Sequence, residues 1–148
     1  REKAMEMGAT HTYSSIEEAA LAVPELTWGD MCDAVILVPG VVTGDMIEPA
    51  LGLTAKGGTL VVTAIGNMME GSADLNLFFL SMMNKSIKGT VFGSGNPRAD
   101  IPALLSMYRE GTLKLDELVT NRYTLDNVNQ GYQDLRDGKN VRGVIDFS

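Results

Sequence analysis

The spacing of hydrophobic positions along this chain alternates between continuous apolar runs and helical periods. The three strongest runs occupy residues 33–38, 58–65 and 87–92. Runs of this kind are typical of strands that are covered on both faces of a sheet. Three shorter strands are predicted at residues 11–13, 118–123 and 143–147.

Two helices are predicted before the first strong strand. Residues 1–7 have the pattern of a helix end, and Gly8 supplies the usual glycine stop. Ser15 and Glu18 have the spacing of a capping box and open a helix that runs through residue 23, where Pro24 stops it. The first helix has no capping residue and no initiator Met before it. We therefore expect this chain to be part of a longer protein.

Three further helices are predicted along the chain. Residues 43–54 have helical spacing, although Pro49 predicts a kink or a late start because it lacks a backbone N–H. A helix over residues 100–110 has Pro102 in its first turn, where proline is well tolerated. The last helix covers residues 124–137. The apolar segment 75–83 is too short and irregular to assign as helix or strand.

Strands that alternate with helices of about ten residues favour an α/β fold built from right-handed βαβ crossovers. We therefore predict a doubly wound parallel sheet rather than a sandwich or a bundle. Two glycines and a proline interrupt the alternation over residues 92–97, and this segment is the predicted boundary between residues 1–92 and 93–148.

The charge distribution argues against a nucleic-acid partner. The chain of 148 residues has a net charge of −7, with 3 Lys/Arg against 11 Asp/Glu in residues 1–74 and 9 against 8 in residues 75–148. Binding a phosphate backbone requires a basic surface, and the later cations are scattered among acids. No run approaches the roughly 18 apolar residues that cross a bilayer, so we expect a soluble protein without a membrane partner.

Catalytic motifs are absent from the sequence. One cysteine, Cys32, and one histidine, His11, are too few for a zinc site within this chain. There is no Gly-x-Ser-x-Gly elbow, and the glycines at 93 and 95 lead into Asn96-Pro97 rather than into the βα turn of a dinucleotide fingerprint. A single cysteine forms no internal disulfide, which suits a reducing compartment, so we expect a cytoplasmic location.

Ligands of open parallel sheets bind beyond the carboxyl ends of the strands. In this chain those ends are Val38, Pro39 and Gly40; Thr63, Ala64 and Ile65; and Thr90, Val91 and Phe92. Glycine at position 40 allows a ligand to approach the backbone closely.

The order of several segments resembles a known family. These segments are Lys-Ala-x-Glu-x-Gly-Ala-Thr at residues 3–10, the strand closed by Gly40, Lys-Gly-Gly-Thr-Leu-Val-Val at 56–62, Ile-Lys-Gly-Thr-Val-Phe-Gly at 87–93 and Asn-Val-Arg-Gly-Val-Ile at 140–145. Together they resemble the C-terminal part of a medium-chain, zinc-type alcohol dehydrogenase. Residues 74–83 and 86–98 are similar to the nicotinoprotein subgroup, which uses an artificial nitroso electron acceptor.

The resemblance implies that residues 1–92 are the C-terminal part of a dinucleotide-binding domain and that residues 93–148 return to the catalytic domain. It implies NAD as cofactor, with NADP not excluded, and a small alcohol or aldehyde as substrate. The strand-end residues given above would surround the ribose and nicotinamide, and Arg142 would face the pyrophosphate, which a guanidinium matches well. The glycine fingerprint, the zinc ligands and the proton relay would lie upstream of residue 1.

The resemblance also implies that neighbouring strands of the sheet lie upstream. We therefore predict that strands 33–38, 58–65 and 87–92 pair with one another, and that segment 11–13 has no partner within this chain. The apolar segment 75–83 beside an edge strand is either core beneath a loop or a subunit interface. We favour the interface and predict a homo-oligomer through Leu75 to Phe92. Two alternatives stay open: a zinc-free quinone oxidoreductase of the same superfamily, and a non-catalytic nucleotide-fold interaction module.

Overall fold

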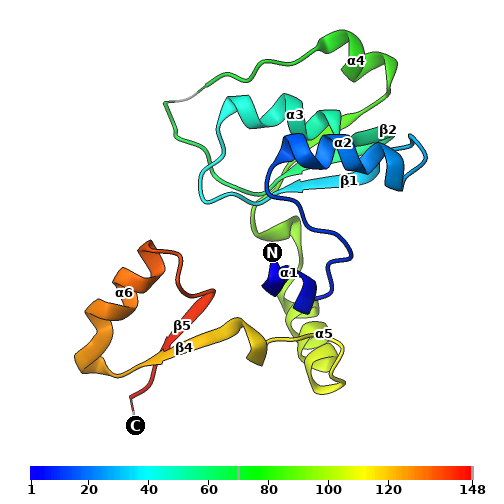
Figure 1. The fold of residues 1–148 in the computed structure, drawn as a ribbon. Helices are drawn as coiled ribbons and strands as arrows, with labels where there is room; N and C mark the ends of the chain where they lie inside the picture. Colours follow the sequence, from blue (N-terminus) through cyan, green and yellow to red (C-terminus); the bar gives the residue numbers. More distant parts are fainter. Residues whose placement is uncertain (70, 148) are drawn as a thin grey trace. The chain divides into compact units, whose positions relative to one another are not determined.

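The computed structural model describes residues 1–69 and 71–147, and the chain divides into two units, Arg1–Gly95 and Asn96–Ser148. Figure 1 traces the elements of both units. Unit 1 contains α1 (Glu2–Glu6), α2 (Ile16–Leu26), β1 (Cys32–Leu37), the 3-10 turn η1 (Gly44–Met46), α3 (Ile47–Gly52), β2 (Thr54–Val62), α4 (Leu77–Met82), β3 (Ser86–Gly89) and the turn η2 (Phe92–Ser94).

The three strands of unit 1 form one parallel sheet in the order β1-β2-β3. Val35 pairs with Leu60, and Leu60 pairs in turn with Ile87. This sheet confirms the predicted α/β class and the predicted association of the three apolar runs. Segment 11–13 forms no ladder with any strand of the described residues, in agreement with the prediction that it has no partner within this chain, and it is not a regular strand. Without a neighbour on which to form a ladder, so short an extended segment has little to stabilise it.

The core of unit 1 lies on one face of this sheet. Ala50, Leu51 and Leu60 are buried, and apolar side chains of α2, α3, α4, β1 and β2 pack against them. In Figure 1, α2 and α3 lie next to each other along the sheet. The opposite face is open, since Ile36 of β1 is 59% exposed. The expectation that these strands are covered on both faces is therefore not met within the described residues.

Helix α2 begins with a modified capping box. The Ser15 side chain accepts a hydrogen bond from the Glu18 backbone N–H at 3.2 Å, as predicted. The Glu18 carboxylate, however, reaches the N–H of Ser14 at 2.8 Å instead of that of Ser15. Hydrogen bonds from the Ser14 hydroxyl and N–H lower the pKa of Glu18. The helix continues past Pro24 to Leu26, because a proline this close to the end disturbs only the last turn.

The stretch around Lys56 departs from the prediction. The helix predicted over residues 43–54 ends at Gly52, and the strand predicted from residue 58 begins already at Thr54 as β2. Between Cys32 and Ala34 of β1, the partner strand advances from Thr54 to Thr59, which makes a wide bulge. Gly57 takes a positive φ of 76° there, a conformation that glycine adopts at little cost. The predicted late start of the preceding helix is confirmed, since a 3-10 turn comes before α3.

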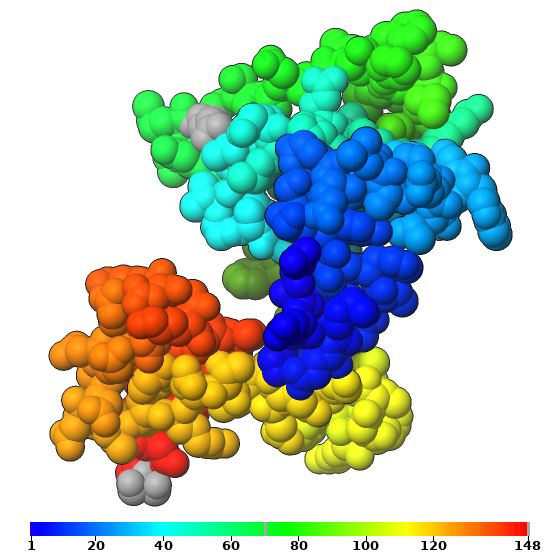
Figure 2. Space-filling model, in the orientation of Figure 1, coloured from blue at the N-terminus to red at the C-terminus, as the bar shows by residue number. Residues whose placement is uncertain are grey.

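The apolar segment that the sequence left unassigned forms α4. Asn76 caps this helix, because its side-chain oxygen accepts a hydrogen bond from the Phe79 N–H at 3.1 Å. Figure 2 shows this segment, in green, at the surface of unit 1. Leu77, Phe78, Phe79 and Met82 of α4 are all exposed. The helix therefore presents an apolar surface. It directly precedes β3, which is an edge strand of the sheet.

Unit 2 contains α5 (Pro97–Arg109), η3 (Asp116–Leu118), β4 (Val119–Tyr123), η4 (Leu125–Asn127), α6 (Val128–Arg136) and β5 (Arg142–Ile145). Strands β4 and β5 are parallel, and α6 connects them. Helix α5 begins at Pro97, three residues before the predicted start. The reason is that Asn96 caps it by accepting a hydrogen bond from the Arg98 N–H at 3.2 Å. Pro97 rather than Pro102 therefore occupies the first turn.

No described residue of unit 2 is buried. Tyr123, Val128, Tyr132 and Leu135 belong to the partly covered face between α6 and the two strands. Over residues 1–69 and 71–147, no helix has both the length and the apolar character needed to span a bilayer.

Candidate functional site

The carboxyl ends of the three strands of unit 1 form one continuous edge. Beyond the last residues of the strands, the Thr63 N–H donates to the Leu37 carbonyl at 3.1 Å, and the Thr90 N–H donates to the Val62 carbonyl at 3.1 Å. A further parallel bridge joins Val42 to Gly66. These bonds bring the nine predicted residues at positions 38–40, 63–65 and 90–92 to one edge of the sheet. Strands β1, β2 and β3 end at Leu37, Val62 and Gly89, so Val38 and residues 63–65 and 90–92 lie just beyond the strands in which they were predicted.

The threonine hydroxyls at this edge are engaged within the chain. The Thr63 hydroxyl donates to the Leu37 carbonyl at 2.9 Å, and the Thr90 hydroxyl lies 2.8 Å from that of Ser94. The Thr63 proton therefore reinforces the pairing between β1 and β2, and only its oxygen lone pairs are free to accept a bond from a ligand.

The same edge carries an exposed apolar rim. Val38, Ile65, Val91 and Phe92 are all exposed, and Phe92 is 99% exposed. Among the described residues, no heavy atom other than those of Gly40 and its two chain neighbours lies within 4 Å of the position that a Cβ at Gly40 would take. An apolar rim beside open backbone suits a ligand that has a flat apolar group and a polar remainder.

A small hollow lies next to this edge. It has a volume of about 310 Å³ and is lined by Val42, Thr43, Gly44, Ile47, Gly66, Gly71, Ser72 and Ala73. The Val42–Gly66 bridge thus contributes both to the edge and to the wall of the hollow.

Arg142, the tenth predicted residue, is the first residue of β5 in unit 2. Its guanidinium makes no ion pair or hydrogen bond within residues 1–69 and 71–147. An arginine without a carboxylate partner is well suited to bind an anion, because its planar donors remain available. The structure thus gathers nine predicted residues in unit 1 and places Arg142 in unit 2.

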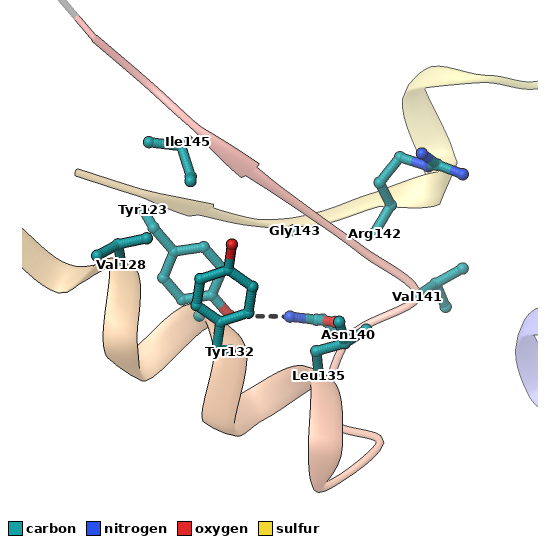
Figure 3. Close-up of a pocket in the computed structure, with 10 residues that line it drawn as sticks. Tyr123, Val128, Tyr132, Leu135, Asn140, Val141, Arg142, Gly143 and Ile145 are labelled. Atoms are coloured by element: carbon teal, nitrogen blue, oxygen red, sulfur yellow. Dashed lines mark hydrogen bonds between the residues drawn. The ribbon is translucent and has the colours of Figure 1, made fainter. Parts of the chain in front are cut away.

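A cavity of about 400 Å³ lies beside Arg142 in unit 2 (Figure 3). Its lining consists of Tyr123, Val128, Gly131, Tyr132, Leu135, Asn140, Val141, Arg142, Gly143 and Ile145. The Arg142 side chain points away from Tyr132 and Leu135, whereas Asn140 points toward Tyr123.

A polar cluster that no sequence pattern predicted lies at this cavity. The Tyr123 hydroxyl donates to Asp134 at 2.9 Å and accepts a bond from Asn140 at 3.0 Å. Hydrogen bonds from the Gln130 amide and then from Tyr123 lower the pKa of Asp134, so its carboxylate stays charged and accepts. Gly131, in the middle of a helix, was the available signal, because a glycine there weakens the helix unless a neighbour needs the space.

The described residues contain no group of three or more His, Cys, Asp or Glu side chains that converges on a metal position.

Comparison with known proteins identifies the family. Residues 1–110 match the family model of the zinc-binding dehydrogenases. The chain belongs to this family, and the resemblance inferred from the order of its segments is confirmed.

Two relatives match almost the whole chain. The NDMA-dependent alcohol dehydrogenase of Amycolatopsis methanolica is 50% identical over 145 residues, which cover 98% of this chain and 39% of that protein. Alcohol dehydrogenase B of Mycobacterium tuberculosis is 47% identical over 148 residues, which cover 100% of this chain and 40% of that protein. The chain therefore spans about two fifths of the length of these relatives.

The fold is also shared with a solved structure. The benzyl alcohol dehydrogenase of Acinetobacter calcoaceticus superposes with a TM-score of 0.84 at 26% identity, over 99% of this chain and 40% of that one. The parallel α/β architecture is therefore that of the dehydrogenase family.

Proposed function

We propose that this chain supplies the second wall of the nicotinamide-cofactor site of an alcohol dehydrogenase. The parent protein would be an oxidoreductase that converts an alcohol and its aldehyde. One observation carries the proposal: the ends of three parallel strands converge on an edge with an apolar rim and an open glycine, Gly40. This is where open α/β sheets bind their ligands. The names of the relatives favour this function over the quinone oxidoreductase and the interaction module.

In this proposal NAD is the cofactor, and NADP is not excluded. When bound, the nicotinamide accepts a hydride from the alcohol carbon. The chain's own part is positioning: residues 38–40 border the ribose, residues 63–65 and 90–92 border the nicotinamide, and Arg142 binds the pyrophosphate. The exposed apolar side chains of the rim would exclude water from one side of the ring. Zinc ligands would come from outside the described residues.

The two parts of the chain take different roles in this proposal. Residues 1–92 form the C-terminal part of the dinucleotide-binding domain, and residues 93–148 return to the catalytic domain. The parent protein would act in the cytoplasm, a prediction based on the single Cys32.

The role of Gly40 provides the sharpest test of the cofactor site. Beyond its two chain neighbours, a valine at position 40 meets no atom of the described residues within 4 Å of its Cβ, so the fold should be unaffected. It would instead occupy the space into which the ribose comes. In the full-length dehydrogenase, we expect Gly40→Val to weaken NADH binding by at least about tenfold, measured by fluorescence titration.

The matched control is Gly52→Val. Gly52 also has open space around its Cβ position, but it lies at the end of α3. Equal NADH affinity in the Gly40→Val protein and the wild type would overturn the proposal.

A second test uses the isolated chain, which should not oxidise any alcohol even with added zinc, because in this proposal the acid–base groups belong to the rest of the parent protein. Turnover by this chain would contradict that expectation.

We also propose that the parent protein is a homo-oligomer through Leu75 to Phe92. The support is the exposed apolar surface of α4, where Phe78 and Phe79 make an edge-to-face pair at 5.7 Å, together with the edge strand β3. A Phe78→Asp substitution should lower the mass measured by analytical ultracentrifugation, since a carboxylate would be buried unpaired. Leu21→Asp, on the exposed side of α2, is the control and should leave the mass unchanged. An unchanged mass in the Phe78→Asp protein would contradict an interface at this site.

A further inference from the structure

The hydroxyl of Tyr123 is the centre of the polar cluster in unit 2. It donates to the Asp134 carboxylate at 2.9 Å and accepts bonds from the Asn121 amide at 3.2 Å and the Asn140 amide at 3.0 Å. A phenol has one proton to donate and two lone pairs with which to accept. All three capacities are used, so the direction of each bond is determined.

This direction fixes the orientation of Asn140. Because the Tyr123 proton goes to Asp134, Asn140 must turn its NH₂ group toward the phenol oxygen (Figure 3). The Oδ1 of Asn140 then faces the other way, and it is buried without a hydrogen-bond partner among the described residues. A buried acceptor without a hydrogen bond lowers the stability of the fold. The bond from the Asn140 amide to Tyr123 therefore holds the side chain in an orientation that costs stability.

The ring of Tyr123 is fixed as well. A Cβ at Gly131 of α6 would lie 3.1 Å from the ring, and a Cβ at Gly143 of β5 would lie 2.8 Å from it. Both elements therefore approach the ring as closely as they do because each has a glycine at the contact. The ring thus connects α6 to the start of β5.

Arg142 lies in the middle of this fixed segment. On one side Asn140 bonds to Tyr123, and the Val141 N–H donates to the Thr120 hydroxyl at 3.0 Å. On the other side Gly143 pairs with Asn121 of β4. The backbone before and after Arg142 is therefore held, while its guanidinium has no partner in the described chain and points away from the cavity.

We infer that Tyr123 and Asp134, acting through Asn140, are positioning residues that hold Arg142 ready for the pyrophosphate of the cofactor. This inference rests on the proposed function, since it takes the pyrophosphate as the anion that Arg142 binds. Fixing the backbone in advance lowers the entropy lost when a long side chain is immobilised on its ligand.

The experiment uses the cofactor-free, full-length dehydrogenase and two probes, ADP-ribose and adenosine. ADP-ribose contains the pyrophosphate and adenosine does not, so calorimetric titration of both separates phosphate contacts from the rest of the site. We expect Arg142→Gln to weaken ADP-ribose binding about tenfold or more and Tyr123→Phe to weaken it about fivefold. Adenosine binding should be unchanged in both variants.

Tyr132→Phe is the matched control, because Tyr132 lines the same cavity but its hydroxyl makes no hydrogen bond within the described residues. A second variant, Asn140→Asp, keeps the size of the side chain but replaces the amide donor by an acceptor, and it should weaken ADP-ribose binding as Tyr123→Phe does. Thermal unfolding and adenosine affinity report whether each variant is folded.

The double variant Tyr123→Phe with Arg142→Gln decides how Tyr123 acts. If Tyr123 works through Arg142, adding Tyr123→Phe to Arg142→Gln should cause no further loss. A further fivefold loss in the double variant, or unchanged ADP-ribose affinity in Tyr123→Phe alone, would overturn the inference. Unchanged affinity in Arg142→Gln would instead remove Arg142 from the proposed cofactor site, so the two failures are distinguishable.

Discussion

The two units of this chain are held together in different ways. Unit 1 has an apolar core, in which Leu60 and Ala50 are fully buried between the sheet and its helices. Unit 2 has no buried residue in the described chain, and side-chain hydrogen bonds around Tyr123 connect its helix to its strands. Apolar packing is non-directional, whereas hydrogen bonds fix orientation. Unit 1 therefore depends on packing, whereas in unit 2 hydrogen bonds fix the orientation of the side chains around Tyr123.

The largest expected effect concerns the apolar core. Leu60→Ala removes a fully buried side chain of β2 and should lower the free energy of unfolding by about 2–5 kcal/mol. Urea denaturation measures the loss, and amide hydrogen exchange should increase in peptides of unit 1. Leu21→Ala, at an exposed position of α2, is the control. A loss below about 1 kcal/mol at Leu60 would mean that unit 1 does not depend on this core.

The next effect concerns the polar cluster around Tyr123. Gly143→Ala places a methyl group 2.8 Å from the Tyr123 ring and 3.1 Å from the Asn140 amide, so the ring must shift. We expect a loss of about 1–3 kcal/mol, with faster hydrogen exchange limited to unit 2. Gly52→Ala, which meets open space, is the matched control. Equal stability of the two alanine variants would show that the ring is not tightly enclosed.

A smaller effect is expected at the start of α2. Ser15→Ala removes the acceptor that caps Glu18 N–H and should lower stability by about 1 kcal/mol. Ser14→Ala is a close comparison, because its backbone N–H still donates to the Glu18 carboxylate. We expect Ser14→Ala to lose less than Ser15→Ala in urea denaturation. The reverse order would assign the capping to Ser14.

The smallest effect is a difference in acid sensitivity. The Gln130 amide and the Tyr123 hydroxyl lower the pKa of Asp134 in the folded protein. A carboxyl with a depressed pKa stabilises the fold above its unfolded pKa of about 3.9, and this contribution is lost as the pH falls through the folded value. Asp134→Asn should therefore flatten the acid side of the stability curve of unit 2. An Asp134→Asn curve identical to that of the wild type would contradict this role of Asp134.

Periodicity predicted the elements that depend on local pattern. The parallel strands β1 to β3, the final helix and the cap at Ser15 all follow from residues close together in the sequence. The same reasoning also placed the strand ends that meet at one edge, because parallel strands must end on the same side. Where these residues contact a cofactor remains a prediction.

The features that the sequence did not predict depend on distant partners. Tyr123, Asp134 and Asn140 are far apart along the chain, and no spacing rule joins a phenol to a carboxylate across a helix. The bulge at Gly57 arises from the register with β1, which a single strand does not reveal. The predicted start of α5 is three residues too late, because the pattern puts Pro102 in the first turn. In the structure Asn96 caps the helix and Pro97 is its first residue.

The turn after β3 has a consequence for how the sequence can vary. Phe92, Gly93 and Ser94 have φ values of 49°, 69° and 54°, so three successive residues are left-handed. The non-glycine positions each cost roughly 1–2 kcal/mol in this conformation. A single change of Phe92 to glycine would therefore make the chain more stable, yet it would delete the most exposed aromatic ring of the rim. Stability and the proposed contact of Phe92 with the nicotinamide would therefore favour different residues at this position.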